Sequence, residues 1–268
     1  DSWDTFQNSD EPEHVLYRAA LQGLSSGPDL FVYLPEADLW QETVGFSFFD
    51  IERTMTFGSL PDVGNIYVGD FDTEAIADAH TARNYTSDAL GDFTMWCGDV
   101  GCDNGAHMDL ANRNLGNPFG GDLGRQQPFI ISDTMIIHSG AVPILIASED
   151  AATDKINSLA DNANYATAVN SIDPEAIVIQ AMFVHPSQIL LDVASFVIEG
   201  DVEGAEEMMT GLSTVPPYNL LMIADTATET EQVAYVTLVY NSLDDAEIAA
   251  ENIPDRIDTM DSMQFVRP

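Results

Sequence analysis

Cys97 and Cys102 are the side chains whose types and spacing fit covalent chemistry best. They are five positions apart, and glycines at 98 and 101 let the backbone fold tightly enough to bring the two sulfurs together. This spacing predicts a local disulfide, with a pair of free thiols as the alternative. A zinc site is disfavoured, because zinc needs four ligands and the sequence holds no second Cys/His cluster.

The segment from Gly98 to Pro128 combines many glycines with Asp and Asn side chains, whose oxygens suit a hard cation such as calcium. The candidate metal ligands are Asp99, Asp103, Asn104 and Asp109. The segment does not follow the EF-hand template, since counting from Asp99 places Leu110 where the bidentate glutamate belongs. Turns stabilised by Asx side chains are the alternative explanation of the same residues.

Other sequence patterns that could indicate a catalytic site lack the surrounding elements or the spacing that catalysis needs. Gly23-Leu-Ser-Ser-Gly27 matches G-x-S-x-G, but a helical pattern precedes it where a hydrolase needs a strand. The five histidines show no ligand spacing, and most are expected at the surface or at strand edges. His107 differs because it lies in the Asp-rich loop, where it suggests a cation-dependent hydrolytic site with Asp99 and Asp103. The sequence itself assigns no catalytic and no cofactor-binding residue.

Charge restricts the partners of this chain. Eight basic residues face forty-five acidic ones, giving a formal net charge of -37, and Lys155 is the single lysine. Such a chain lacks the cations needed to hold nucleic acid, anionic membranes or phosphorylated substrates. It also repels itself, so we expect divalent or monovalent counterions, or a cationic partner, close to its surface.

The expected location is extracytoplasmic: secreted, periplasmic or anchored at the cell surface. No stretch approaches the ~18 to 20 apolar residues of a membrane helix, and polar residues interrupt the most apolar one, 176–198. A chain that starts at Asp1 without Met fits removal of a signal peptide. A local disulfide fits an oxidising compartment.

Three segments repeat one pattern, in which an apolar strand is followed by an acidic turn and a helix. Asp, Ser or Asn at each helix start is expected to cap the first turn, where acids also meet the positive end of the helix dipole. The expected strands are 66–72, 143–148 and 235–240, and the helices after them are 73–80, 149–156 and 241–248.

Other apolar runs predict the remaining elements. Further strands are expected at 92–96, 176–183 and 218–224, with a hairpin over 129–138 that turns at Ser132–Asp133. The strand at 176–183 is expected to be buried, and the strand at 218–224 to pair with 232–240. Further helices are expected at 13–23, 187–198 and 203–211.

This order of elements predicts an α+β fold of two tandem lobes related to the ferredoxin-like topology, with mostly antiparallel sheets and helices on one face. The expected parts are a polar leader with an N-terminal helix at 1–27, a first lobe at 28–172 containing the long loop 98–128, and a second lobe at 173–268. The second lobe is expected to lack its closing strand, which the N-terminal segment, a continuation of the chain past Pro268 or a neighbouring subunit would supply. An open sheet edge of that kind accepts a strand from a partner protein or another subunit.

Four short motifs resemble bacterial lipoproteins and secreted proteins that have no assigned activity. They are Phe48-Phe-Asp-Ile-Glu-Arg53, Val68-Gly-Asp-Phe-Asp72, Asn117-Pro-Phe-Gly-Gly121 and Pro216-Pro-Tyr218. The resemblance extends from about residue 45 onward and implies export and surface anchoring. It brings no catalytic residues with it, and this sequence shows no lipid-bearing N-terminal Cys.

The sequence therefore favours a non-enzymatic, exported and highly acidic surface or assembly protein that binds a partner protein or a ligand. One alternative is an extracellular cation-dependent hydrolase with its site in the loop 98–128. Another is a soluble ligand-capturing protein with a cleft between its two lobes.

Overall fold

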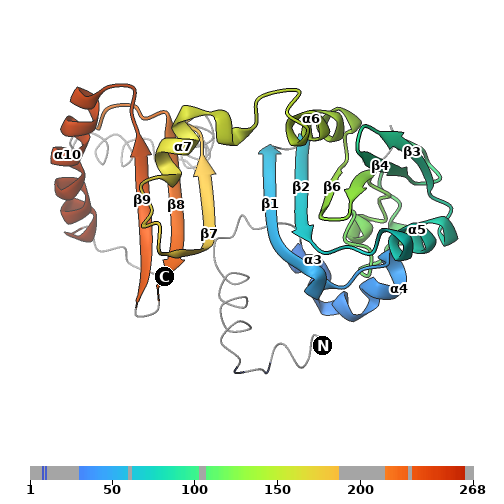
Figure 1. Ribbon diagram of the computed structural model, residues 1–268. Coiled ribbons are helices and arrows are strands. Elements are labelled where there is room, and N and C mark those ends of the chain that lie inside the picture. The colour runs from blue at the N-terminus through green and yellow to red at the C-terminus, as the bar shows by residue number, and fades with distance from the viewer. Residues whose placement is uncertain are drawn as a thin grey trace, which may run out of the picture. The chain divides into compact units, whose positions relative to one another are not determined.

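The chain divides into two units, each with its own antiparallel sheet (Figure 1). Unit 1 is Asp1–Ser158 and unit 2 is Leu159–Pro268, so the boundary precedes the one expected after residue 172. The computed structural model describes Asn8, Asp10 and residues 30–59, 62–102, 107–186, 215–228 and 231–262. Helices and antiparallel sheets occur in both units, which confirms the predicted α+β class.

The sheet of unit 1 has the strand order β1-β2-β6-β5-β4-β3, and all neighbouring strands are antiparallel. The predicted hairpin is confirmed, with Asp133 and Thr134 between its strands, and so is the strand expected at 92–96. The strands are β1 Ile51–Ser59, β2 Asp62–Gly69, β3 Thr86–Leu90, β4 Phe93–Cys97, β5 Phe129–Ser132 and β6 Met135–Ser139.

Helix α5, Thr73–Ala82, begins where the sequence predicts, because the Asp72 carboxylate accepts hydrogen bonds from the Glu74 and Ala75 amides. It carries the chain from β2 to β3 at the far edge of the sheet. The other helical segments of unit 1 are α3 Leu30–Tyr33, η1 Leu34–Leu39, α4 Trp40–Val44, η2 Phe48–Asp50, η4 Leu110–Asn112, η5 Gly121–Leu123 and α6 Val142–Ala152.

The strand expected at 143–148 is wrong, because these residues form the first turns of α6. Pro143 lies in the first helical turn, where its missing N–H costs no hydrogen bond. Leu145 is fully buried whereas Ile146 is 42% exposed, so the apolar run is buried on one side only. A short apolar run of this kind does not distinguish a strand from a helix by periodicity.

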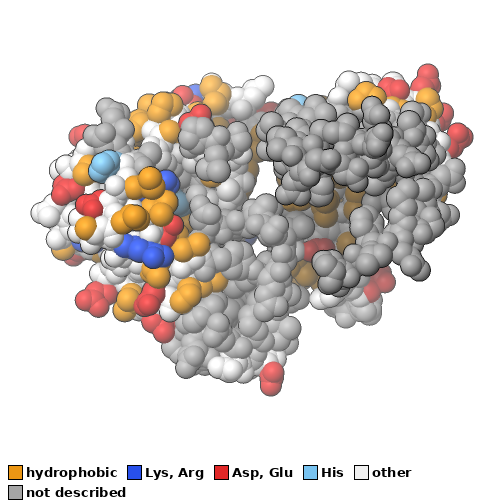
Figure 2. Space-filling model, turned by 180° about the vertical axis from the view of Figure 1, so that it is seen from behind, with side chains coloured by type: hydrophobic (Ala, Val, Ile, Leu, Met, Phe, Trp, Pro, Cys, Tyr) orange, Lys and Arg blue, Asp and Glu red, His pale blue; other side chains and the backbone are white. Residues whose placement is uncertain are grey.

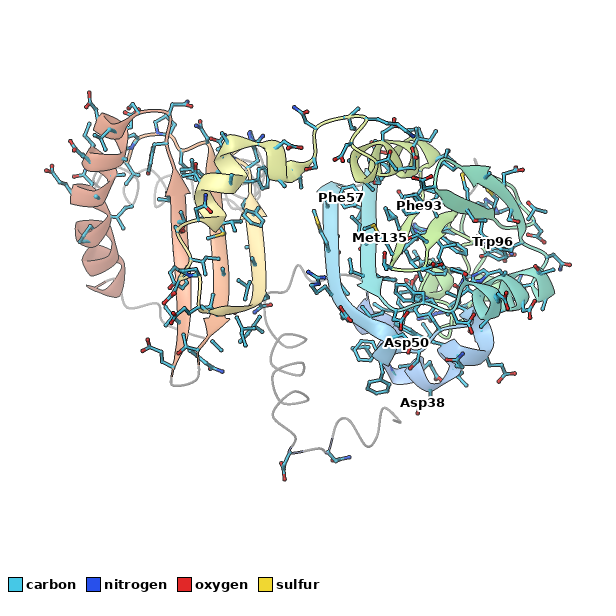
Figure 3. All side chains as sticks on the ribbon, in the orientation of Figure 1. Asp38, Asp50, Phe57, Phe93, Trp96 and Met135 are labelled. Atoms are coloured by element: carbon cyan, nitrogen blue, oxygen red, sulfur yellow. A yellow bond between two sulfur atoms is a disulfide. The ribbon has the colours of Figure 1, made fainter. Side chains whose placement is uncertain are left out.

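Helices cover both faces of the first sheet, so the expectation of helices on one face is wrong for unit 1. On one face Tyr67, Trp96 and Phe129 pack against residues of α4 and α5, including Trp40 and Ile76. On the other face Phe93, Ile130 and Ile137 pack against Leu145 of α6. Figure 3 labels Trp96 and Phe93, which belong to these two different clusters. Central strands that are buried on both faces are apolar at nearly every position. Their sequences therefore do not alternate between apolar and polar residues.

Unit 2 contains a three-stranded sheet within its described residues, in the order β7-β8-β9. Its elements are η6 Leu159–Asp161, α7 Ala163–Val169, β7 Ile177–Val184, β8 Leu220–Ala227, β9 Gln232–Val239 and α10 Leu243–Ser262. Ala168 of α7 packs on Leu220 and Met222, and the predicted pairing of β8 with β9 is confirmed. β7 is an edge strand with Ile177 65% exposed, so the expectation of a buried strand there is wrong.

The strand order differs from a ferredoxin-like sheet because of where β7 and β1 pair. The strand expected at 176–183, within the second lobe, pairs with β8 in unit 2. Strand β1 pairs with β2, although no strand was predicted over residues 51–59. The two sheets therefore share the antiparallel class but not the expected order.

Some expectations fall outside the described residues: the helices at 13–23, 187–198 and 203–211, and the leader at 1–27 apart from Asn8 and Asp10. Among the helices that the structure does describe, none is long and apolar enough to cross a membrane.

Candidate functional site

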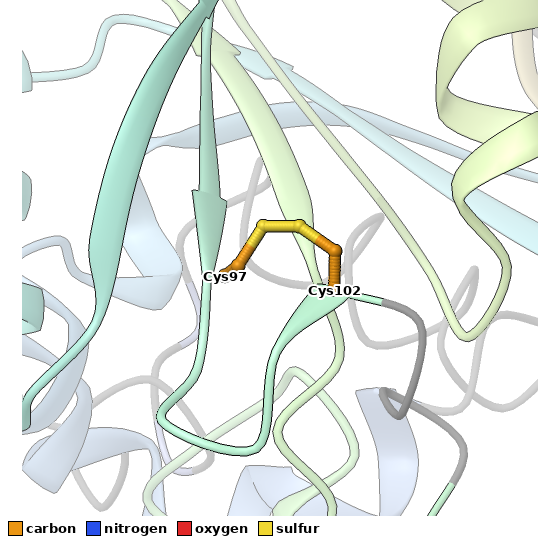
Figure 4. Close-up of a disulfide and its surroundings, with 2 residues drawn as sticks. All are labelled: Cys97 and Cys102. Atoms are coloured by element: carbon orange, nitrogen blue, oxygen red, sulfur yellow. A yellow bond between two sulfur atoms is a disulfide. The ribbon is translucent and has the colours of Figure 1, made fainter.

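A disulfide joins Cys97, the last residue of β4, to Cys102 (Figure 4). The two Cα atoms are 4.8 Å apart. Gly101 has a φ of 84°, which only glycine adopts without strain, and it lets the chain reverse between the two sulfurs. The side chain of Gln126 packs directly against Gly98. The disulfide therefore closes a tight turn that packs against the C-terminal part of the loop 98–128.

The predicted metal ligands are not assembled within the described part of the chain. Asp99 lies in the exposed turn inside the disulfide loop, while Asp103 and Asn104 are outside the described residues. The Asp109 carboxylate caps η4 by accepting hydrogen bonds from Ala111 N at 3.2 Å and Asn112 Nδ2 at 2.7 Å. No group of three or more His, Cys, Asp or Glu side chains that could hold a metal occurs among the described residues. The cation site and the hydrolytic site with His107 stay predictions.

The loop from 107 to 128 is folded tightly on itself. Asp109 N donates to the Leu123 carbonyl at 3.1 Å, and Asn114 N donates to the Gly121 carbonyl at 2.8 Å. A side chain at Gly124 would overlap the Asp109 carbonyl, so this position requires glycine for close approach. The many glycines and Asx residues of this segment thus have a structural explanation in backbone contacts and turns.

Phe119 anchors this loop in the core of unit 1. Its side chain is fully buried, and its ring stacks on Phe129 of β5 with the centroids 4.7 Å apart. The buried Asn117 side chain accepts a hydrogen bond from Phe119 N at 3.2 Å and so fixes the backbone beside the ring. An apolar anchor of this size holds the exposed parts of the loop at fixed positions.

His138 of β6 is buried and hydrogen-bonded at both ring nitrogens. Its Nδ1 lies 3.0 Å from Gln127 Oε1 and its Nε2 lies 2.8 Å from the Tyr67 hydroxyl. Gln127 Oε1 only accepts, so Nδ1–H is the donor and Nε2 accepts from the tyrosine. Burial lowers the pKa of His138 to about 3, which keeps the imidazole neutral at neutral pH.

His80 of α5 is also enclosed, among the rings of Tyr85 and Phe129 at 4.9 and 4.6 Å. Its Nδ1 lies 2.9 Å from the Ile76 carbonyl, to which Nδ1–H donates. Burial is the main cause that lowers the pKa of His80 to about 4. The expectation of surface or strand-edge histidines is therefore wrong for His80 and His138. Both act as neutral core residues without access to a substrate.

Lys155 makes the only ion pairs among the described residues. Its ammonium lies 2.6 Å from Glu149 Oε2 and 3.4 Å from Asp150 Oδ1. Glu149 is only 2% exposed, so the lysine neutralises a carboxylate that folding has taken out of water. This structural use accounts for the single lysine of the chain.

Two arginines of the long loop stand in contrast to Lys155. Arg113 and Arg125 have no carboxylate within 4.0 Å in the described part of the chain, although the whole chain carries a formal net charge of -37. The Nε of Arg125 is buried and has no hydrogen-bond partner among the described residues. Arg113 is exposed and therefore available to an outside carboxylate, whereas Arg125 is half-buried and exposes only part of its side chain.

Large apolar side chains lie close to Arg113 along the chain, and η4 contacts the η5 segment that precedes Arg125. Met108 is 56% exposed and Leu110 is 67% exposed. The contacts of Gly124 with Asp109 and Asn112 bring both ends of the loop together. We call the surface formed by Met108, Leu110, Arg113 and Arg125 the loop surface. Figure 2 shows hydrophobic side chains beside basic ones on one face of unit 1, with acidic side chains scattered around them.

No protein-family model, curated protein or solved structure matches this chain. The geometry of the loop surface and of the buried histidines therefore carries the functional argument. Sequence reasoning missed the loop surface because Arg113 and Arg125 are separated along the chain by a Gly-rich stretch. The available signal was the clustering of two of the eight basic residues within one segment.

Proposed function

We propose that this chain is a non-enzymatic, exported protein that binds a partner protein through the loop surface. The partner would contribute a segment in which carboxylates stand beside apolar side chains. The observation that carries this proposal is the pair of arginines without carboxylate partners among the described residues, next to exposed Met108 and Leu110. The disulfide supports an extracytoplasmic location.

The chemistry of the loop surface is typical of a recognition site. Arg and Met are enriched in protein interfaces, and arginine pairs with carboxylates through two parallel hydrogen bonds. The overall negative charge attracts cationic molecules without specificity, but at ~0.15 M salt the Debye length is ~8 Å. The loop between 107 and 125 carries Arg113 and Arg125 against Asp109 and Asp122, so it lacks the acidic excess of the rest of the chain and can accept an acidic segment.

The placement of the titratable side chains supports recognition over catalysis. General acid–base catalysis needs a group that titrates near neutral pH and reaches the substrate. His80 and His138 are buried and neutral, and the Asp109 carboxylate is used to cap η4. Met108, Leu110 and Arg113 of the loop are exposed, and these groups bind but do not transfer protons at neutral pH.

Fluorescence anisotropy with short labelled peptides tests the proposal. A peptide of alternating leucine and aspartate should bind the wild-type protein more tightly than a peptide of alternating serine and aspartate. The double variant R113E/R125E should weaken binding of the leucine–aspartate peptide by about a hundredfold, ~1.4 kcal/mol for each tenfold step. Arg53→Glu, at an exposed arginine on β1, is the matched control and should leave binding nearly unchanged.

A peptide of alternating leucine and lysine separates local from general attraction. It should bind weakly and in a salt-sensitive manner, and R113E/R125E should strengthen rather than weaken it. The proposal fails if the leucine–aspartate peptide does not bind, or if R113E/R125E and Arg53→Glu change its affinity equally.

A further inference from the structure

Strand β1 is an unusual edge strand, because it is exposed on both faces. The residues from Glu52 to Thr56 are all exposed, whereas β2 beside it alternates between buried and partly buried positions. A strand packed on one face shows exposure at every second residue. The layers that cover the first sheet therefore leave the middle of β1 open, and the outer edge of β1 lies beside no other strand of the described sheet.

The middle of β1 lacks the usual protection against strand addition. Thr54, Met55, Thr56 and Phe57 carry no charge and include no proline, and their side chains favour extended backbone. Protective features occur only at the two ends: a register irregularity between Ile51 and Arg53, and Gly58 with a φ of 90°. The opposite edge, β3, is shorter and carries Asp88.

The side chains of this segment are already ordered on the sheet. The Thr56 hydroxyl donates to Asn65 Oδ1 of β2 at 2.7 Å. The ring of Phe57 lies over Gly64 on the other face, close to Ile144 of α6. Figure 3 labels Phe57 on β1. A strand fixed in this way loses little further conformational entropy when another strand pairs with it.

We propose that the β1 edge pairs with β1 of a second copy of this chain, antiparallel about a twofold axis at Met55. This register places Met55 opposite Met55, Thr54 opposite Thr56, and Arg53 opposite Phe57. Glu52 then faces Gly58, so no two like charges are directly opposite each other. Threonine pairs and pairs of an arginine with an aromatic ring both stabilise neighbouring strands.

The local charge of β1 permits a second copy at this edge. From Arg53 to Ser59 the strand carries one positive and no negative charge, in a chain whose net charge is -37. Two copies can therefore meet along β1 without bringing carboxylates together, which they cannot do along β3. The twofold arrangement joins the two sheets into one continuous antiparallel sheet. This proposal is independent of the loop surface.

Sedimentation velocity of the purified chain at several protein and salt concentrations tests the proposal. The dimer should become tighter as salt rises from about 0.01 M to about 1 M, because the Debye length falls from about 30 Å to about 3 Å and screens the repulsion of the two acidic protomers. Met55→Lys places two ammonium groups opposite each other and should weaken the dimer at least about tenfold. Ser87→Lys on β3 makes the same charge change and should not weaken it.

Met55→Cys provides a second readout that does not depend on a loss of association. Under mild oxidation it should give a covalent dimer, with the disulfide between the two substituted positions identified by peptide mapping, while Ser87→Cys should form no covalent dimer. Circular dichroism checks that each variant remains folded. A wild-type chain that is monomeric at every salt concentration, or a dimer that Ser87→Lys disrupts and Met55→Lys does not, would overturn the proposal.

Discussion

The core around His138 and the loop surface belong to the same unit but use polar side chains in opposite ways. His138 is enclosed and satisfied by Tyr67 and Gln127. Arg113 and Arg125 belong to the loop that Phe119 ties to this core, yet no described carboxylate pairs with them. The fold thus buries His80 and His138 and exposes Arg113, which can recognise a carboxylate. This contrast is what leads us to a binding function.

The largest effect should come from removing the residue that connects the two regions. Phe119→Ala should lower the free energy of unfolding by about 3 to 5 kcal/mol, because it leaves a cavity between Phe129 and the loop. Urea denaturation measures this loss. Leu110→Ala, at an exposed residue of the same loop, is the control and should change stability by less than about 0.5 kcal/mol. Equal losses in the two variants would show that the loop is not anchored by Phe119.

Acid should destabilise the core through its two histidines. Their pKa values are about 4 for His80 and about 3 for His138 in the folded protein, both below the ordinary 6.5. The unfolded chain therefore binds more protons than the folded chain below pH 6.5. Stability is fully present above pH 6.5 and falls as the pH is lowered towards these values, by at most about 1.4 kcal/mol per pH unit for each histidine.

Urea denaturation between pH 7 and about pH 5 checks this slope, in a range where the carboxylates of unfolded chains are still largely ionised. His80→Phe should reduce the slope by about half, since one of the two buried histidines is then absent. His107→Phe should not change it, because His107 is exposed. A flat pH profile for the wild-type protein would mean that neither histidine is neutral and buried in the way described.

The disulfide should have an intermediate effect. It closes a loop with a sequence separation of 5, for which chain entropy gives a stabilisation of about 2 kcal/mol. The double variant C97A/C102A should lose about this amount in urea denaturation. Thiol titration of the native protein should find no reactive thiol. Two free thiols in protein purified under oxidising conditions would contradict the disulfide and weaken the argument for export.

The smallest effect on stability should come from the loop surface itself. R113E/R125E should change the free energy of unfolding by about 0.5 kcal/mol or less at the exposed Arg113 and by about 1 kcal/mol at the half-buried Arg125. The same variant should lose peptide binding. If R113E/R125E were as destabilising as Phe119→Ala, the two arginines would be structural and not part of a binding surface.

Local patterns of the sequence predicted local structure well. Asp72 at the start of α5 and the hairpin of β5 and β6 were predictable, because capping and turn formation depend on neighbours along the chain. The apolar run at 143–148 was misassigned, since burial on one side of a helix and burial within a sheet produce the same short run. The position of β1 at the sheet edge was not predictable, because it depends on the pairing of β1 with β2.

The site was predictable only in part. The loop 98–128 was identified from its composition, and so was the Cys97–Cys102 pair, because both signals are contiguous in the sequence. The roles of the acidic residues in this loop were not predictable. The Asp109 carboxylate caps η4, and this contact is visible only in the folded structure. Among the described residues, no carboxylate lies within ion-pair distance of Arg113 or Arg125. The sequence does not give these distances, so it could not predict this.

Mapping of amide chemical shifts in the isotope-labelled protein, titrated with the leucine–aspartate peptide, tests the binding function most directly. We expect saturable shifts at residues 107–125, centred on Met108, Leu110, Arg113 and Arg125, with no shifts of comparable size in β3 or α10. A peptide that leaves these residues unshifted, or shifts residues all over the acidic surface to the same extent, would contradict recognition by the loop surface.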